Sequence, residues 1–152
     1  MRRFLMLLFL FGSLSLVNAS DATGRVIKVL PLLLDQKGQD ATSPSLYDRD
    51  AYQAYLRQHA AETFAVRYDV LWKASDVGES KLKLRVELRG VDTNNLPRQL
   101  TLEQPVKPKF FRSWTEIKLA GADYKNFPSI NSWRVTLWSD DQLLGEQKSF
   151  LW

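Results

Sequence analysis

The stretch KLKLRVELR, residues 81–89, alternates a charged residue with an aliphatic one at every step. Its aliphatic side chains, Leu82, Leu84, Val86 and Leu88, therefore point to one side of an extended chain, and its charged side chains point to the other. A strand with one apolar and one charged face is typical of an antiparallel sheet that covers a core with one side only. The stretch predicts such a sheet, packed against a second apolar layer.

Residues 62–73 repeat this alternation with larger side chains. The apolar face of this second strand consists of Phe64, Val66, Tyr68, Val70 and Trp72. Because Trp72 shares its face with aliphatic residues, we expect it to lie in the core.

Shorter segments with strand patterns follow one another with turn signals every ten residues or so. They are residues 25–34, 98–104, 113–119, 132–138 and 142–152. Together with the two longer strands they predict a mainly β fold, an antiparallel two-sheet sandwich of about seven strands. The run Ser139-Asp140-Asp141 predicts a tight turn that joins the last two strands into a hairpin.

Two of these strands carry features that protect a sheet edge. Pro31 lacks the backbone donor of a ladder and predicts a kinked edge strand over residues 25–34. The lysines of residues 81–89 suggest that this strand is an edge as well, because charged side chains discourage the addition of further strands.

One helix interrupts the strands, after the first of them. Ser45, followed three residues later by Asp48, forms a plausible capping box, and we expect a helix over about residues 46–59. The residues expected on its packed face are Tyr47, Ala51, Ala54, Tyr55 and Gln58, and those expected on its exposed side are Arg49, Asp50, Gln53 and Arg57.

The N-terminus has the order of a secretory signal. Arg2 and Arg3 precede the apolar run 4–11, and Val17-Asn18-Ala19 offers small residues before a cleavage site. We expect residues 1–19 to be removed and residues 20–152 to form a single domain in the periplasm or outside the cell, with no membrane span after cleavage. A retained membrane anchor is the alternative, but the apolar run is shorter than the ~20 residues that a bilayer core requires.

Composition excludes several classes of function. Without Arg2 and Arg3, the chain has 19 basic and 17 acidic residues, and this net charge of +2 gives no reason to expect nucleic acid as a partner. The chain has no cysteine and one histidine, so the usual zinc sites are excluded and the core must stabilise the fold without disulfides. No glycine-rich phosphate loop is present, and we expect no cofactor.

A resemblance supports the sandwich. The segment SWRVTLW, residues 132–138, precedes Asp140-Asp141, Leu143-Leu144 and Ser149-Phe150. This order of a tryptophan-rich strand, an aspartate turn and a closing strand with a phenylalanine resembles the last hairpin of bacterial immunoglobulin-like or fibronectin-type domains. The resemblance covers about twenty residues, and the cysteines of the immunoglobulin disulfide and an evident tyrosine corner are absent. It implies a β-sandwich and no particular activity, since this architecture serves many purposes.

Candidates for catalysis have simpler structural explanations. His59 lies near the predicted end of the helix, where a histidine can face the last carbonyl groups. The close carboxylate pairs Asp48/Asp50 and Asp140/Asp141 lie at a helix start and in a turn. A small hydrolase would need two carboxylates that face each other across a pocket, and nothing in the sequence indicates one.

The most unusual stretch is residues 104–114, in which cations and aromatic residues alternate between two prolines and the next strand. The candidate contact residues in it are Lys107, Lys109, Phe110, Phe111, Arg112 and Trp114. Aromatic faces stack on sugars, and cations bind carboxylate or phosphate groups, so the stretch predicts a recognition loop. The alternative is a crossing between sheets whose aromatic side chains fill the core.

Trp138 is a further candidate contact. It lies beside the predicted turn, opposite the face of Trp133, and an exposed tryptophan there would suit a binding site. The helix 46–59 is the other possible neighbour, and we favour this cover because a short helix needs tertiary burial to persist.

These observations predict a non-catalytic exported domain that binds an envelope protein or a polymer surface. A carbohydrate-binding module is the alternative. It requires that at least two of the aromatic residues Phe110, Phe111, Trp114 and Trp138 be exposed and coplanar.

Overall fold

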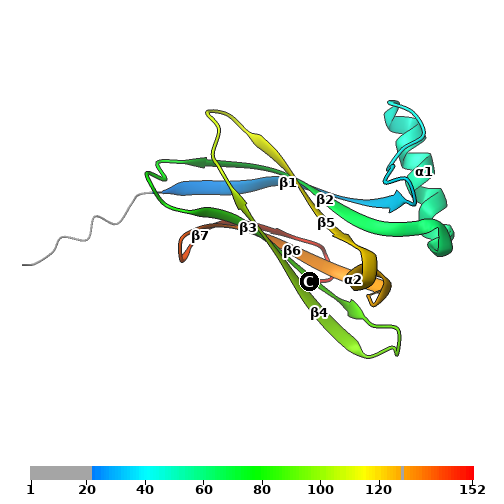
Figure 1. The fold of residues 1–152 in the computed structure, drawn as a ribbon. Coiled ribbons are helices and arrows are strands. Elements are labelled where there is room, and N and C mark those ends of the chain that lie inside the picture. Colours follow the sequence, from blue (N-terminus) through cyan, green and yellow to red (C-terminus); the bar gives the residue numbers. More distant parts are fainter. Residues whose placement is uncertain (1–21, 128) are drawn as a thin grey trace, which may run out of the picture.

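The computed structural model describes residues 22–127 and 129–152, and the predicted signal peptide, residues 1–19, lies outside them (Figure 1). The described residues form seven strands, of which the longest are β1 and β2. Their bounds are β1 (Thr23–Asp35), β2 (Thr63–Ser75), β3 (Leu82–Val91), β4 (Pro97–Val106), β5 (Ser113–Ala120), β6 (Ser129–Ser139) and β7 (Gln142–Lys148). The mainly β prediction is confirmed.

The strands form two antiparallel sheets with the orders β1-β2-β5 and β4-β3-β6-β7. The chain therefore enters the first sheet, moves to the second, returns once for β5 and ends in the second. This strand order is that of an immunoglobulin-like Greek-key sandwich, with β4 paired in the larger sheet.

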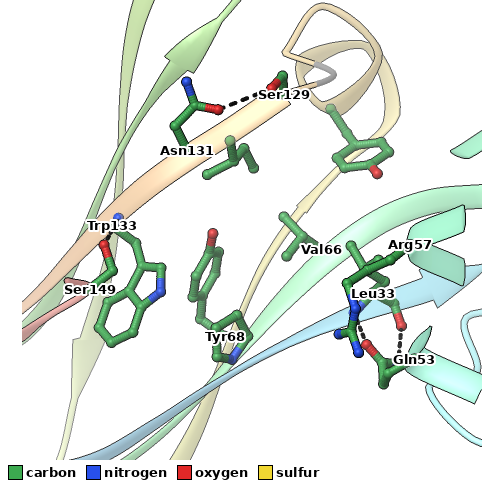
Figure 2. Close-up of a pocket in the computed structure, with 12 residues that line it drawn as sticks. Leu33, Gln53, Arg57, Val66, Tyr68, Ser129, Asn131, Trp133 and Ser149 are labelled. Atoms are coloured by element: carbon green, nitrogen blue, oxygen red, sulfur yellow. Dashed lines mark hydrogen bonds between the residues drawn. The ribbon is translucent and has the colours of Figure 1, made fainter. Parts of the chain in front are cut away.

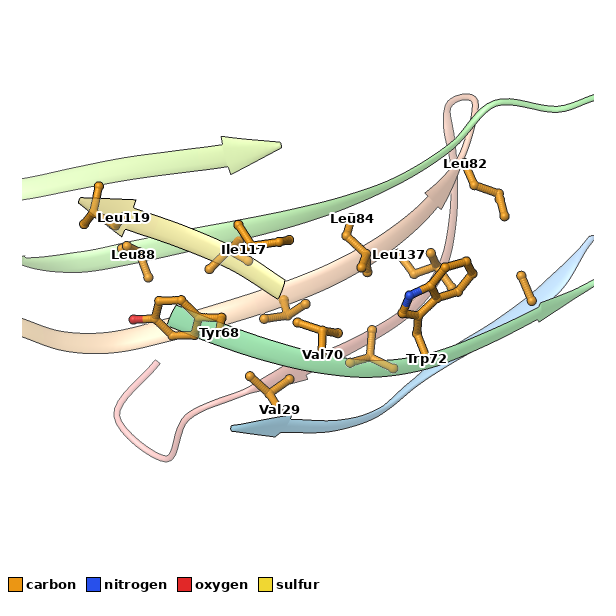
Figure 3. Close-up of a cluster of buried hydrophobic side chains, with 14 of the residues drawn as sticks. Val29, Tyr68, Val70, Trp72, Leu82, Leu84, Leu88, Ile117, Leu119 and Leu137 are labelled. Atoms are coloured by element: carbon orange, nitrogen blue, oxygen red, sulfur yellow. The ribbon is translucent and has the colours of Figure 1, made fainter. Parts of the chain in front are cut away.

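The core lies between the sheets and uses the two alternating strands as the sequence predicts (Figure 3). Tyr68, Val70 and Trp72 of β2 are almost completely buried, and so are the four aliphatic residues of β3. Phe64, which precedes them on the same face of β2, is exposed. The buried aliphatic residues of β3 are Leu82, Leu84, Val86 and Leu88.

The prediction that residues 81–89 form an edge strand is wrong, because β3 lies in the centre of its sheet between β4 and β6. Its charged face instead forms cross-strand ion pairs. Arg85 Nε donates to Glu103 of β4 at 2.6 Å, and Glu87 accepts from Arg134 of β6 at 2.8 and 3.0 Å. A charged outer face therefore does not distinguish an edge strand from a central one.

The prediction of an edge strand at Pro31 is confirmed, because β1 pairs with β2 alone and Pro31 is exposed. An irregularity between Val26 and Lys28 releases Ile27 from the β2 register, and the carbonyl of Ile27 accepts from Gln147 Nε2 of β7 at 3.0 Å. A Cβ atom at Gly145 would lie 2.7 Å from the Cα atom of Arg25. Glycine at this position therefore permits β1 to approach β7 and to close the sandwich.

The helix after β1 is present as α1 (Leu46–Gln58), capped by Ser45, whose hydroxyl accepts from the backbone N–H of Asp48. Its packed face differs from the predicted one. Gln53 and Leu56 are buried, whereas Tyr47 and Tyr55 are exposed. The structure also contains a 3-10 turn, η1 (Ala60–Glu62), and a short helix, α2 (Gly121–Lys125), which the sequence analysis did not predict.

Gln53 is buried because it completes the hydrogen bonding of the β1 edge. Its Oε1 accepts from the backbone N–H of Leu33 at 2.8 Å, and its Nε2 donates to the carbonyls of Leu33 at 2.8 Å and of Asp40 at 2.9 Å. A single amide side chain thus satisfies three backbone groups. These hydrogen bonds stabilise the buried position of Gln53, although the apolar pattern had placed this residue on the exposed side of the helix.

The last strand is shorter than predicted. β7 ends at Lys148, and Phe150 is fully exposed. Trp152 is half-buried, with the guanidinium groups of Arg89 and Arg134 at 3.8 and 5.0 Å from its ring centre. Among the described residues, no helix has the length and apolar character needed to cross a membrane.

Replacing Gln53 by alanine should lower the free energy of unfolding by about 1–3 kcal/mol, because both backbone groups of Leu33 lose their partner. Urea denaturation measures this loss. Gln58→Ala, at an exposed position of the same helix, is the control and should change stability by less than about 0.5 kcal/mol. Equal stability of the two variants would contradict the role of Gln53.

Candidate interaction surface

The segment that connects β4 to β5 crosses from the larger sheet to the smaller one at the end of the sandwich opposite α1 (Figure 1). Both of its ends are fixed by strand pairing, since Val106 pairs with Leu82 and Ser113 pairs with Trp72. The indole N–H of Trp72 also donates to the Thr115 hydroxyl at 2.9 Å. Both ends of the loop are therefore attached to strands whose side chains form the buried core.

The aromatic side chains of this loop and of the start of β5 face solvent. Phe110 and Phe111 of the loop are 89% and 74% exposed, and Trp114 of β5 is 53% exposed. The alternative expectation, in which they fill the core, does not describe this structure. The rings of Phe110 and Phe111 meet edge to face, with centres 4.8 Å apart and planes at 89°.

The cations of the loop are also exposed. Lys107, Lys109 and Arg112 take part in no ion pair or hydrogen bond with the residues that the structure describes. In contrast, Lys83 and Arg85, on the neighbouring strand, are both paired with Glu103. The loop thus presents positive charge that the protein itself leaves available.

A groove of about 670 Å³ borders the loop. It lies where the β2–β3 and β6–β7 connections meet the start of the loop. Its charged lining consists of the lysines Lys81, Lys83 and Lys107 and the aspartates Asp140 and Asp141. The two connections are joined directly, because the Lys81 N–H donates to the Asp140 carboxylate at 3.1 Å and the Asp140 N–H donates to the Lys81 carbonyl at 2.9 Å.

Lys81 and Lys83 line this groove, and the sequence analysis did not single them out. The strand order predicts that these two lysines lie near the loop. Because every strand is antiparallel to its neighbours and spans the sandwich, successive connections alternate between its two ends. The β2–β3, β4–β5 and β6–β7 connections must therefore meet at one end, and α1 and α2 must lie at the other.

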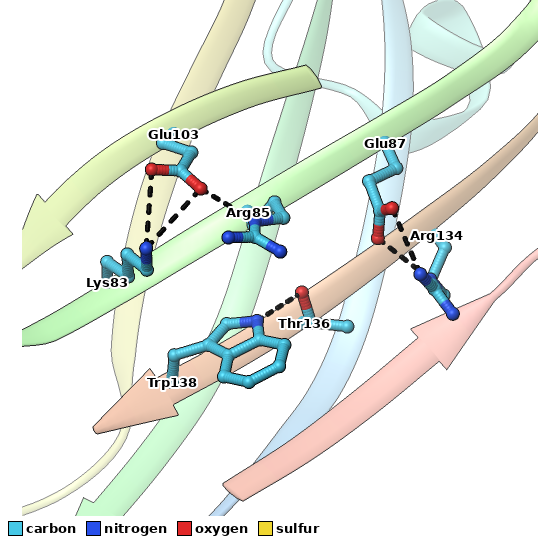
Figure 4. A network of polar contacts seen from close by, with 7 residues as sticks. All are labelled: Lys83, Arg85, Glu87, Glu103, Arg134, Thr136 and Trp138. Atoms are coloured by element: carbon cyan, nitrogen blue, oxygen red, sulfur yellow. Dashed lines mark hydrogen bonds and ion pairs between the residues drawn. The ribbon is translucent and has the colours of Figure 1, made fainter. Parts of the chain in front are cut away.

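The prediction that α1 covers Trp138 is wrong, since α1 packs against β1 of the other sheet. Trp138 lies on the outer face of the larger sheet and is half-buried. Its indole N–H donates to Thr136 Oγ1 at 2.8 Å, and the Arg85 guanidinium lies 5.1 Å from its ring centre (Figure 4). An arginine side chain thus takes the place expected for the helix.

Arg85 contacts two neighbouring side chains, Glu103 and Trp138. The hydrogen bond from Arg85 holds the pKa of Glu103 below its usual value, and Lys83 adds to this effect. Because Arg85 contacts both Glu103 and Trp138, one face of Trp138 is engaged by the protein itself.

Two of the residues considered for catalysis, His59 and Asp48, make contacts near the ends of α1. The His59 ring stacks on Tyr55 with centres 4.0 Å apart, and its Nδ1 lies 2.9 Å from the Tyr55 carbonyl in the last turn of α1. The Asp48 carboxylate accepts from the Ser43 hydroxyl at the start of α1. Residues 22–127 and 129–152 contain no cluster of His, Asp or Glu side chains suited to a metal ion.

The fold defines the chain as an immunoglobulin-like β-sandwich. Among solved structures, it is similar to an immunoglobulin-like protein from Pseudomonas aeruginosa, with 12% identity, coverage of 82% of this chain and 93% of that chain, and a TM-score of 0.39. No protein-family model matches the sequence, and the comparison with curated proteins gives no match. The assignment of the fold therefore rests on the strand order itself.

Replacing Phe110 and Phe111 together by serine should change the free energy of unfolding by no more than about 0.5 kcal/mol, because both side chains are exposed. Ile117→Ala, in the buried part of β5, should cost about 2–5 kcal/mol in the same urea titration. A loss in the double variant as large as that of Ile117→Ala would show that the loop rings belong to the core.

Proposed function

We propose that this chain is an exported, non-catalytic binding domain that contacts another protein of the cell envelope through residues 107–114 and the adjoining groove. One observation carries the proposal. Free cations alternate with exposed aromatic side chains on a loop whose two ends are fixed by the core. Aromatic residues, phenylalanine among them, and arginine are enriched at protein interfaces, and a site whose ends are fixed loses less entropy on binding.

The chemistry of the loop indicates what its partner must offer. Lys107, Lys109 and Arg112, together with Lys81 in the groove, require carboxylates on the partner. Phe110 and Phe111 require an apolar depression. An acidic protein surface with a hydrophobic pocket meets both requirements.

The geometry gives less support to a carbohydrate-binding module. Sugar platforms need coplanar exposed rings, but the planes of Phe110 and Phe111 are at 89° to each other. Trp138, the fourth aromatic candidate, is half-buried and lies beside Arg85. The polysaccharide partner therefore stays the second hypothesis.

Export to the periplasm or beyond is part of the proposal and rests on the sequence. Residues 1–19 have the charged, apolar and small-residue order of a secretory signal. The resemblance of residues 132–150 to bacterial exported domains of this architecture agrees with that assignment.

A crosslinking pull-down from cell-envelope extract tests the proposal. The baits are the exported protein, the variant Lys107→Glu/Lys109→Glu/Arg112→Glu and a control with the same change in charge at the opposite end, Lys37→Glu/Lys118→Glu/Lys125→Glu. All three control lysines are exposed. We expect the protein and the control to recover the same partner, and the loop variant to recover at least tenfold less.

Recovery of the same partner by all three baits would contradict the role of the loop. Recovery of no protein by any bait, combined with co-sedimentation of the protein with isolated envelope polysaccharide, would contradict the protein partner and favour the second hypothesis.

A further inference from the structure

A cavity of about 450 Å³ opens at the other end of the sandwich, between β1 and β2 of one sheet and β6 of the other (Figure 2). The two helices border it, since Gln53 and Arg57 of α1 and Tyr124 of α2 contribute to its lining. Its volume falls within the range of about 300–1,000 Å³ that is usual for small-molecule sites. It does not overlap the groove beside residues 107–114.

Tyr68 is the central side chain of this cavity. Only 1% of it is exposed, and its ring contacts Trp133 edge to face with centres 6.4 Å apart. Figure 2 shows the Tyr68 ring between Trp133 and Val66 with its hydroxyl group directed into the cavity.

The Tyr68 hydroxyl has no hydrogen-bond partner among the residues that the structure describes. The hydroxyl is not among the fully buried atoms without a partner, so it can be reached from the cavity, by water or by a bound molecule. Burial, and the nearby Tyr124, also raise the pKa of Tyr68, so its hydroxyl keeps its proton and can donate at neutral pH. A ligand in the cavity would therefore find a hydrogen-bond donor at Tyr68.

Other donors line the same space. The Trp133 indole N–H, the Tyr124 hydroxyl and the Arg57 guanidinium have no partner within residues 22–127 and 129–152. The Gln53 amide, in contrast, is engaged with the backbone of Leu33 and Asp40. The lining contains a cation and several free donors but no Asp or Glu side chain, so an anionic acceptor complements it.

Three further polar residues of the lining, Ser129, Asn131 and Ser149, take part in hydrogen bonds within the protein, and the rest of the lining is apolar. Leu33, Val66 and Ile130 contribute aliphatic surface, and the rings of Tyr68 and Trp133 contribute aromatic surface. A ligand that suits the cavity therefore combines a compact apolar or aromatic body with one acidic group.

We infer that this cavity binds a small organic carboxylate, whose apolar body packs against Tyr68 and Trp133 and whose carboxylate accepts hydrogen bonds from Arg57 and from the free hydroxyl groups. The site is independent of the proposed protein contact, because the two lie at opposite ends of the sandwich.

Nuclear magnetic resonance tests the inference with 3-phenylpropionate as the probe and 3-phenylpropionamide as its uncharged match. The full chain is expressed with ¹⁵N labelling, and the protein is purified after whatever processing occurs in the cell. The Trp133→Phe variant assigns the Trp133 indole resonance. We expect 3-phenylpropionate to shift this resonance in a saturable way, and the amide to bind at least tenfold more weakly.

Two variants connect the binding to the cavity. Arg57→Gln should weaken the binding of 3-phenylpropionate at least fivefold, whereas Arg25→Gln, an equal change of charge on an exposed residue near the other end of β1, should leave it unchanged. Tyr68→Phe keeps the ring and removes the free hydroxyl, so it should weaken binding severalfold.

Three results would overturn the inference. They are a lack of any saturable shift of the Trp133 resonance at millimolar probe, equal affinity for acid and amide, and an Arg57→Gln variant that binds as well as Arg25→Gln. The first of these would mean that water alone fills the cavity.

Discussion

The contact between the apolar faces of β2 and β3 is the interaction on which the rest of the structure depends. Trp72, Tyr68 and Val70 pack with the aliphatic residues of β3 in one buried cluster, although the two strands belong to different sheets. Because the chain has no cysteine, this hydrophobic contact holds the sheets together without a disulfide. Each of the two strands also fixes one end of the 107–112 loop through its pairing with β5 or β4.

The antiparallel order then divides the molecule into two ends with different chemistry. At one end, three connections meet and present free lysines with exposed aromatic rings. At the other end, the two helices border a cavity with an arginine and several free donors. The ion pairs of the outer face of the larger sheet, such as Glu87 with Arg134, satisfy the charges between these ends. Each of the two proposed sites therefore contains polar groups that have no partner among the described residues.

The sequence predicts those parts of the fold that depend on alternation within one strand. The core faces of β2 and β3, the edge position of β1 and the β6–β7 turn are all read from local patterns. It does not predict features that depend on a distant partner. The burial of Gln53 requires the unpaired backbone of Leu33, and the half-buried state of Trp138 requires Arg85 from the neighbouring strand. The composition of residues 107–114 is enough to single them out, whereas the cavity at Tyr68 is lined from six parts of the chain and leaves no local signature.

Native-state hydrogen exchange on the purified protein tests whether a stable core supports a solvent-exposed loop at residues 107–112. We predict that interior amides of β2, β3 and β6 exchange only through global unfolding, while the amides of residues 107 and 109–112 exchange almost as fast as in an unfolded chain. Protection of the loop amides equal to that of β3 would contradict this prediction, because the loop would then be part of the packed structure. Rapid exchange throughout β3 would contradict it as well, because the strand that fixes the loop would not belong to the stable core.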